Sequence, residues 1–255
     1  MSEMFQIRCP SCNCKLNAED GSIGQTKNCP QCNTPILIQR PIDRAFDLAL
    51  SSPLMEDFRK EQIRHDAEQG NAEAQSALGL YYFYGDGVPE DTAEAVKWFH
   101  KAAEQGNADA QFRLGLCYEY GTGVPKNDTE SANWYHKAAE QGHANAQDNL
   151  GSCYFDGRGV PQDDDEAAKW VAKAAEQGIA DAQCLLGWLY ENGRGVSKDH
   201  TKAAELYRKA AVQGHCIAQN NLGWSYFHGR GVSQDGIEAI KWFRKVIEKA
   251  DLRYC

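Results

Sequence analysis

Apolar side chains recur at helical spacing along most of the chain, in blocks that resemble one another. In the block that begins near residue 70, Ala74, Leu78 and Tyr82 stand four residues apart, which places them on one face of a helix. After a short polar stretch, Ala95 and Trp98 begin a second set of the same kind. Each block therefore predicts two amphipathic helices, which we name helix A and helix B in chain order.

These blocks repeat with a period of 36 residues, and five of them follow one another. A leucine followed by glycine marks helix A in every block, and a tyrosine stands four residues after each leucine. Because one helical hairpin cannot bury both of its faces, we expect the blocks to stack as the units of a solenoid. The glycines at the unit boundaries are Gly70, Gly106, Gly142, Gly178 and Gly214.

Glycine and capping residues predict where each helix ends and begins. Helix A of the first unit should end at Gly85, because Gly85 and Gly87 permit positive φ and Pro89 cannot continue a helix. Asp91 and Glu94 have the spacing of a capping box, so helix B should begin there. The same spacing recurs at Asn127 and Glu130, at Asp163 and Glu166, and at Asp235 and Glu238.

A glycine also stands inside each helix A, where it costs about 1 kcal/mol relative to alanine. Its recurrence in all five units, first as Gly79, requires a structural reason. We expect helix A to approach helix B closely at this glycine, with a large helix B side chain as its partner. The expected partners are Trp98, Trp134, Trp170 and Trp242, with Leu206 in the remaining unit.

The first unit shows the complete motif: Ala74-Gln75, Leu78-Gly79, Tyr82, Gly85-x-Gly87-Val88, Asp91, Ala95, Trp98-Phe99 and the run from Lys101 to Gly106. This motif resembles the Sel-1-like repeat, a relative of the tetratricopeptide repeat, over about residues 70 to 250. The resemblance implies an all-α superhelical solenoid of helix-turn-helix repeats, whose usual work is to scaffold protein complexes. In two units Ser197 and Ser233 replace the loop proline.

Four cysteines near the start of the chain have the spacing of metal ligands. Cys9 and Cys12 form one C-x2-C pair, and Cys29 and Cys32 form a second pair after sixteen intervening residues. This pattern is typical of a tetrahedral zinc site in which four thiolates leave no open position, so the zinc should be structural. We interpret the nearby Cys14 as a bystander.

Short strand-like runs at residues 5–8 and 34–39 lie beside the two cysteine pairs and predict a small β zinc ribbon of two hairpins. So short a module has little core, and zinc would supply its folding free energy. The expected organisation is a zinc ribbon at 1–40, a linker with a short helical turn at 41–52, an N-terminal capping helix at 53–69 that starts at Pro53, five Sel-1-like repeats at 70–250, and a tail at 251–255. The last repeat ends in Val246 to Ala250, which suits a terminal capping helix.

Charge and composition narrow the possible partners. The 255 residues carry 27 basic and 36 acidic side chains, a formal net charge of −9. Residues 1–45 account for a net charge of +1, so the remainder is strongly acidic and argues against nucleic acid as the main partner. No apolar stretch is long enough to cross a membrane, and the start lacks the pattern of a secretory signal.

Five further cysteines are scattered singly over the repeats, and we interpret them as small buried side chains or surface thiols. With no secretory signal and no paired cysteines in the units, we expect a cytoplasmic protein. These cysteines are Cys117, Cys153, Cys184, Cys216 and Cys255.

No catalytic motif stands out in the sequence. The chain lacks the G-x-S-x-G, S-x-x-K, H-E-x-x-H and P-loop patterns, and its seven histidines fall at helix ends or solvent-type positions. The acidic run from Asp163 to Glu166 is interpreted as a solvated helix start rather than a calcium site. We therefore expect a protein that is not an enzyme.

The function that this predicts is a non-enzymatic scaffold or adaptor, which binds a protein or peptide on the concave face of the array. Half of the residues expected there could instead pack between neighbouring units. By analogy with tetratricopeptide repeats, the expected binding residues are Leu80, Phe83, Tyr84, Phe112, Leu116, Tyr120, Phe155, Trp188, Trp224 and Phe227.

Two alternative functions stay open. Zinc ribbons often contact DNA or RNA, so the N-terminal module could bind nucleic acid. A cysteine-rich branch of the Sel-1-like family is described as binding or hydrolysing β-lactams. Its members have paired cysteines within each unit, whereas Cys117 and Cys153 stand 36 residues apart in equivalent positions of adjacent units.

Overall fold

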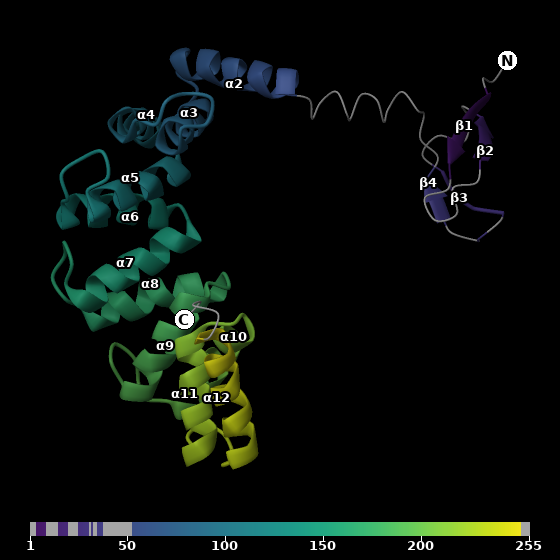
Figure 1. The fold of residues 1–255 in the computed structure, drawn as a ribbon. Coiled ribbons are helices and arrows are strands. Elements are labelled where there is room, and N and C mark those ends of the chain that lie inside the picture. Colours follow the sequence, from purple (N-terminus) through teal and green to yellow (C-terminus); the bar gives the residue numbers. More distant parts are fainter. Residues whose placement is uncertain are drawn as a thin grey trace. The chain divides into compact units, whose positions relative to one another are not determined.

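The chain divides into two compact units, Met1–Ile63 and Arg64–Cys255 (Figure 1). The predicted linker with its helical turn and the predicted tail lie outside the described residues. The computed structural model describes residues 4–8, 15–19, 25–30, 32, 35–37 and 53–250.

The N-terminal compact unit, Met1–Ile63, contains two antiparallel hairpins within its described residues. In one, β1 (Met4–Arg8) pairs with β2 (Lys15–Glu19). In the other, β3 (Thr26–Asn28) pairs with β4 (Pro35–Leu37). The two strand-like runs of the sequence overlap β1 and β4 within the described residues.

The second unit consists of helices joined by short loops. The last turn of α2 (Pro53–Glu68) opens this unit, and α2 begins at the proline that the sequence places at the first helical position. Helices A and B of the repeats follow as pairs: α3 (Ala72–Tyr84) with α4 (Thr92–Glu104), α5 (Ala108–Tyr120) with α6 (Asp128–Glu140), α7 (Ala144–Asp156) with α8 (Asp164–Glu176), α9 (Ala180–Asn192) with α10 (His200–Val212), and α11 (Cys216–His228) with α12 (Gly236–Ala250). The predicted all-helical solenoid is confirmed.

Caps hold the helices at the predicted positions. Asn71 Oδ1 accepts a hydrogen bond of 2.9 Å from the backbone N–H of Ala74 at the start of α3. Gly85 ends α3 with a φ of 71°, in the left-handed region that favours glycine. Asp91 then starts α4, because its side chain accepts a hydrogen bond of 2.9 Å from the N–H of Glu94.

The glycine inside each helix A lies against helix B, but its partner is not the expected tryptophan. A Cβ added at Gly79 would stand 2.6 Å from the ring of Phe99, and one at Gly115 would stand 2.5 Å from the ring of Tyr135. The close approach is confirmed, and the partner is the residue that directly follows the tryptophan position. In the other units this residue is Val171, Tyr207 and Phe243.

The tryptophans pack between units instead. Trp134 lies in a core cluster with Ala95 and Phe99 of α4, which belong to the preceding repeat. Successive residues of a helix point about 100° apart, so the tryptophan faces the preceding unit while the next residue faces its own helix A. Trp170, Leu206 and Trp242 contact the core of the preceding unit in the same way.

A buried glutamine in helix A connects the ends of two B helices, a contact that was not predicted from the sequence. Gln111 Nε2 donates to the carbonyl of Ala103 at 3.0 Å, at the end of α4. Its Oε1 accepts a hydrogen bond of 2.7 Å from Gln141 Nε2, at the end of α6. The same pair of bonds is made by Gln75, Gln147 and Gln183.

The second glycine of each loop lets the loop approach the preceding unit. Gly123 lies so close to the carbonyl of Thr92, the first residue of α4, that any Cβ would overlap it. Stacking therefore requires glycine here. The same contact joins Gly159 to Asp128, Gly195 to Asp164 and Gly231 to His200.

The last helix, α12, exposes apolar side chains at positions that are buried in α10. Its Ile240 and Ile247 are 53% and 61% exposed, whereas Ala204 and Ala211 at the same positions of α10 are both buried. Lys241, Arg244 and Lys245 are exposed on the same helix, and the terminal capping helix expected from Val246 to Ala250 stays a prediction.

The cysteines of the repeats divide into two kinds. Cys117, Cys153 and Cys184 are buried thiols, as the sequence predicts. Cys216, at the start of α11, is disulfide-bonded, which corrects the expectation for this residue. Cys255 lies outside the described residues.

Across the described residues, no helix combines the length and the hydrophobicity that crossing a membrane requires.

Candidate partner-binding site

One face of helix A stays open to solvent in the stacked array. In α5 the exposed or half-buried positions include Asp109, Arg113, Leu116 and Tyr120, which are spaced as one helical stripe. Ala110, Leu114 and Cys117, on the opposite side of α5, are buried between the helices. We call the surface formed by these four positions in all units the helix A face.

The structure separates the ten predicted binding residues into exposed and half-buried ones. Tyr84, Tyr120, Trp224 and Phe227 are exposed. The other six are half-buried and pack partly against the core clusters. These six are Leu80, Phe83, Phe112, Leu116, Phe155 and Trp188.

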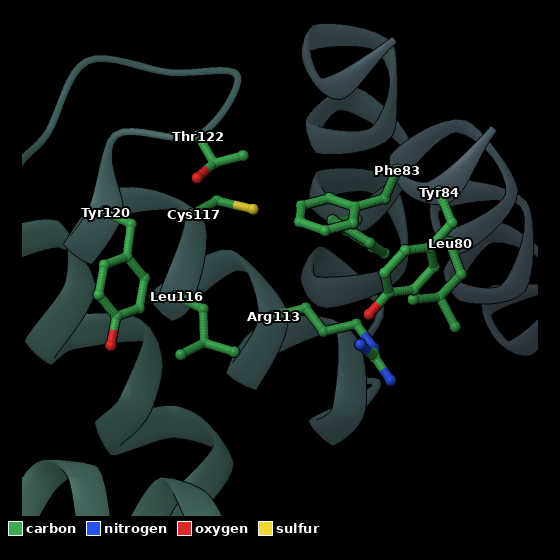
Figure 2. A pocket seen from close by; sticks show the side chains of 9 residues that line it. Leu80, Phe83, Tyr84, Arg113, Leu116, Cys117, Tyr120 and Thr122 are labelled. Atoms are coloured by element: carbon green, nitrogen blue, oxygen red, sulfur yellow. The ribbon is translucent and has the colours of Figure 1, made fainter. Parts of the chain in front are cut away.

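Five of the ten meet at the junction between the first and second units. They line a pocket of about 160 Å³ between α3 and α5 (Figure 2). Figure 2 shows Phe83 pointing across this pocket toward Cys117. The lining residues are Leu80, Phe83, Tyr84, Leu116 and Tyr120 from the prediction, with Phe99, Arg113, Cys117 and Thr122 in addition.

The remaining predicted residues lie elsewhere along the array. Phe155 and Trp188 form an edge-to-face pair with ring centroids 5.4 Å apart, at the junction of the third and fourth units. Trp224 and Phe227 pair at 5.7 Å in the last unit. Phe112 stacks on His143 at 4.6 Å. The ten residues thus form separate groups rather than one continuous groove.

An arginine of the Gly-x-Gly loop reaches across each of the three later junctions. Arg158 pairs with Glu119 at 2.6 Å, and Arg230 with Glu191 at 3.6 Å. Arg194 forms a bidentate ion pair with Asp164, with distances of 2.6 and 2.7 Å.

At the junction of the third and fourth units, this arginine also covers an aromatic ring. The guanidinium of Arg194 stands 4.7 Å from the ring centroid of Phe155, which occupies the position that Phe83 has at the first junction. The loop residue at the first junction is Thr122, which is much shorter. The pocket therefore lies where the other junctions have an arginine.

Arg113 is the cation of this pocket. Among the residues that the structure describes, no carboxylate pairs with Arg113, whereas the three loop arginines all have one. Burial raises the pKa of Cys117 to about 11, although the positive charge of Arg113 opposes this shift. The thiol is thus neutral near pH 7 and contributes an apolar wall.

A carboxyl group lies further along the array, on α7. Burial raises the pKa of Asp148 to about 6, and the negative charge of Asp181 adds to the shift. Within residues 53–250, no cation or hydrogen-bond donor meets its side chain. The first junction therefore offers a positive charge, whereas α7 offers a carboxyl group whose pKa is about 6.

The predicted zinc ligands lie only partly within the described residues. Cys29 and Cys32 are described in the segment between β3 and β4, and neither forms a disulfide. Cys9 and Cys12 lie outside the described residues. In the part of the chain that is described, no three histidine, cysteine or acidic side chains gather to hold a metal ion.

Arg113 and Thr122 were not among the residues predicted from the sequence. A signal for Thr122 was present in the repeat itself, because the residue between the two loop glycines differs among the units. These residues are Asp86, Thr122, Arg158, Arg194 and Arg230. The acidic run from Asp163 is confirmed as a helix cap, since Asp163 Oδ1 accepts hydrogen bonds from the N–H groups of Asp165 and Glu166.

Comparison with known proteins agrees with the repeat pattern. The family profile described as Sel1 repeat matches residues 72–107, 108–143, 144–179, 180–215 and 216–251.

Two solved structures are similar to most of this chain. One is c5321, a protective antigen of uropathogenic Escherichia coli strains with an SLR fold. Its TM-score is 0.72 at 36% identity, over 83% of this chain and 49% of that one. The other is a Sel1 repeat protein from Oxalobacter formigenes, with a TM-score of 0.67 at 36% identity, over 80% of this chain and 76% of that one.

A shorter similarity joins the chain to the secretory immunoglobulin A-binding protein EsiB of Escherichia coli O6:H1. The two are 41% identical over 53 residues, which are 21% of this chain and 11% of EsiB. The chain thus corresponds to a small part of EsiB and to about half of c5321.

Proposed function

Because the chain belongs to the Sel1 repeat family, we propose that it is a non-enzymatic scaffold or adaptor that binds a protein or peptide on its helix A face. The observation that carries this proposal is the open apolar pocket at the first junction, flanked by exposed aromatic side chains on the same face. Aromatic residues contribute much of the binding energy in protein interfaces.

The way the units pack supports this choice of surface. The helix A glycines such as Gly115, the glutamines such as Gln111 and the helix B tryptophans such as Trp134 are used in contacts within or between repeats. Helix A is left with one stripe of residues that vary from unit to unit, and this variation is what a partner could recognise. The name of EsiB states that it binds a protein, which supports the class of ligand without identifying one.

The proposal is tested by capturing partners with the purified chain and with two variants. Tyr120→Ala and Trp224→Ala remove exposed aromatic side chains of the helix A face without opening the core. Val212→Ala is the control, because Val212 is 69% exposed at the end of helix B in α10. We expect the partner to be lost or weakened with the first two variants only. Equal capture by all three would contradict the proposal.

We further propose that residues 1–40 form a structural zinc module whose ligands are Cys9, Cys12, Cys29 and Cys32. What supports it is the spacing of the two C-x2-C pairs, together with the burial of Cys29 between two short strands. Zinc would be held by the four thiolates and would stabilise the fold of this unit.

The other expectations from the sequence stay predictions. These are the cytoplasmic location, the bystander role of Cys14 and the absence of catalysis. No observation on the described residues favours nucleic-acid binding or β-lactam hydrolysis, and neither is proposed.

A further inference from the structure

The pocket at the first junction is a space that another part of the array fills with its own side chains. At the junction of the third and fourth units, Arg194 covers Phe155 and Trp188 packs beside it. At the first junction, Thr122 stands in the position of Arg194 and Leu116 in the position of Trp188. Both replacements are smaller, and the ring of Phe83 is left without a cover from the loop.

The size of this space fits one aromatic ring. The pocket measures about 160 Å³, and its walls include Leu80, Phe83, Phe99 and Leu116. An apolar protein cavity of about 150 Å³ binds benzene. A phenyl ring inserted here would take the place that the arginine side chain has over Phe155.

The positive charge of Arg113 determines which group of a ligand is favoured next to the bound ring. Arg113 is half-buried in the wall and pairs with no carboxylate among the described residues. Asn149 and Asn221 occupy its position in the third and fifth units, so this cation is not part of the repeat pattern. A half-buried guanidinium beside an apolar wall favours a carboxylate partner, since the pair can form charge-assisted hydrogen bonds.

The flanks of the pocket indicate how a chain would cross it. Tyr84 and Tyr120 lie on its two sides (Figure 2) and are 69% and 71% exposed. Each offers a flat ring along which a peptide backbone can run, so the pocket is open for a chain to enter on one side and leave on the other. This arrangement suits the interior of a peptide better than a chain terminus.

We propose that the first junction binds an extended acidic peptide segment, with a phenylalanine ring in the pocket and the carboxylate of an adjacent glutamate on Arg113. This rests on the proposed function and specifies the chemistry of the ligand. The determinants are Arg113, which supplies the charge, and Thr122, which leaves the space. Trp188 and Arg194 close the corresponding space two units further on.

The test measures binding of short peptides to the full chain by calorimetry, with methyl NMR signals of Leu80 and Leu116 as the local readout. The probe is an acetylated and amidated Gly-Ser-Glu-Phe-Ser-Gly peptide. Its controls replace Glu with Gln, or Phe with Ala. A third control, Gly-Ser-Phe with a free carboxyl end, tests whether a chain terminus is preferred.

We expect the Glu-Phe peptide to bind and to shift both methyl signals. Replacing Glu with Gln should weaken binding at least fivefold, and replacing Phe with Ala should abolish it. Tighter binding of the peptide with the free carboxyl end would overturn the internal-segment proposal. Equal binding of the Glu and Gln peptides, or no shift of either methyl signal, would overturn it as well.

Two variants taken from the repeat itself provide the protein-side test. Thr122→Arg introduces the residue of three other units, and Leu116→Trp introduces the residue of the last two. Either one should fill the pocket and abolish peptide binding while the chain stays folded. Arg113→Asn should weaken the Glu peptide at least fivefold and leave the Gln peptide unchanged. Undiminished binding to a folded pocket-filling variant would overturn the proposal.

The outcome is separable from that of the proposed function. If a captured partner depends on Tyr120 and Trp224 but the Glu-Phe peptide does not bind, this inference alone fails. If capture is independent of the helix A face, the proposed function fails too.

Discussion

At the scale of single residues, helix A leaves no room for a side chain where it crosses helix B. Gly115 and Tyr135 show this most clearly, because the tyrosine ring fills the place of the missing Cβ. The ring is held there by a hydrogen bond of 2.5 Å from its hydroxyl to Glu119, so it cannot easily move aside. Glycine is therefore a packing residue here, and its low helix propensity is offset by the close contact.

Replacing this glycine should destabilise the array. We expect Gly115→Ala to lower the free energy of unfolding by about 1–3 kcal/mol, since the added methyl group overlaps the ring of Tyr135. Gly236→Ala is the control, because a Cβ at Gly236 would meet nothing within 4 Å. Urea denaturation followed by circular dichroism measures both. A Gly115→Ala protein as stable as the control would contradict the packing described here.

A second residue-scale prediction concerns Asp148 and pH. Its pKa is raised to about 6, so the folded state holds the proton more tightly than the unfolded state does. The ionised carboxylate therefore destabilises the fold, and stability should fall as the pH rises from about 4 to 6 and then stay at the lower level.

Asp148→Asn removes this penalty and uses the residue that stands at the same position in the last unit, Asn220. Above pH 7 we expect the variant to be more stable than the wild type by about 2 kcal/mol. Near pH 4 the difference should shrink toward zero. Thermal unfolding at several pH values measures this, and a difference that is independent of pH would show that the carboxyl group is not buried as described.

At the scale of elements, the helices are connected by hydrogen bonds as well as by apolar packing. Gln111, Gln147 and Gln183 of helix A each join the ends of two B helices, and Gln75 joins α2 to α4 in the same way. A polar side chain at a buried position is stabilising only when its donor and acceptor both find partners, and Gln111 satisfies both. Gln219 differs, because no donor among the described residues reaches its Oε1.

This difference gives a matched pair of variants. Gln147→Met loses two hydrogen bonds and leaves the carbonyl of Ala139 and the amide of Gln177 without this partner, so we expect a loss of about 2 kcal/mol in unfolding free energy. Gln219→Met loses only the bond to Ala211 and removes an unsatisfied oxygen, so its cost should be clearly smaller. Equal costs in urea denaturation would argue against the connecting role.

The sequence predicts helix ends, caps and the period of the array well, because these depend on spacing within a few residues. It misplaces Trp98 and its equivalents, since a one-residue step turns a side chain by about 100° and only the packed geometry decides which residue meets Gly79. The pocket was missed for another reason. The pocket exists because Thr122 is shorter than the arginine at the same position of three other repeats. A motif search detects residues that match a pattern and does not detect the space left by a smaller side chain.

At the scale of the whole molecule, the chain carries two units with different sources of stability. The repeat unit is held by contacts between neighbouring helices along its length. The N-terminal compact unit, Met1–Ile63, is short, and its described residues form two small hairpins and the first part of α2. Units of that size usually need a metal or disulfides in addition to a core.

If zinc supplies this stability, its loss should affect the zinc module at residues 1–40 alone. We expect one zinc per chain by mass spectrometry on protein purified without a histidine tag, and none with Cys29→Ser. The helical circular dichroism of the repeats should stay unchanged in this variant, and Cys14→Ser should keep its zinc. Absence of zinc from the wild-type protein would overturn the zinc module.

The central claim is that a partner binds on the helix A face, and site-specific photo-crosslinking tests it most directly. A photoreactive phenylalanine derivative at position 120 replaces one aromatic residue by another of similar shape, and position 212 on α10 serves as the comparison. The account predicts that crosslinks to a partner form at position 120 and not at position 212. Crosslinks that form mainly at position 212 would contradict it.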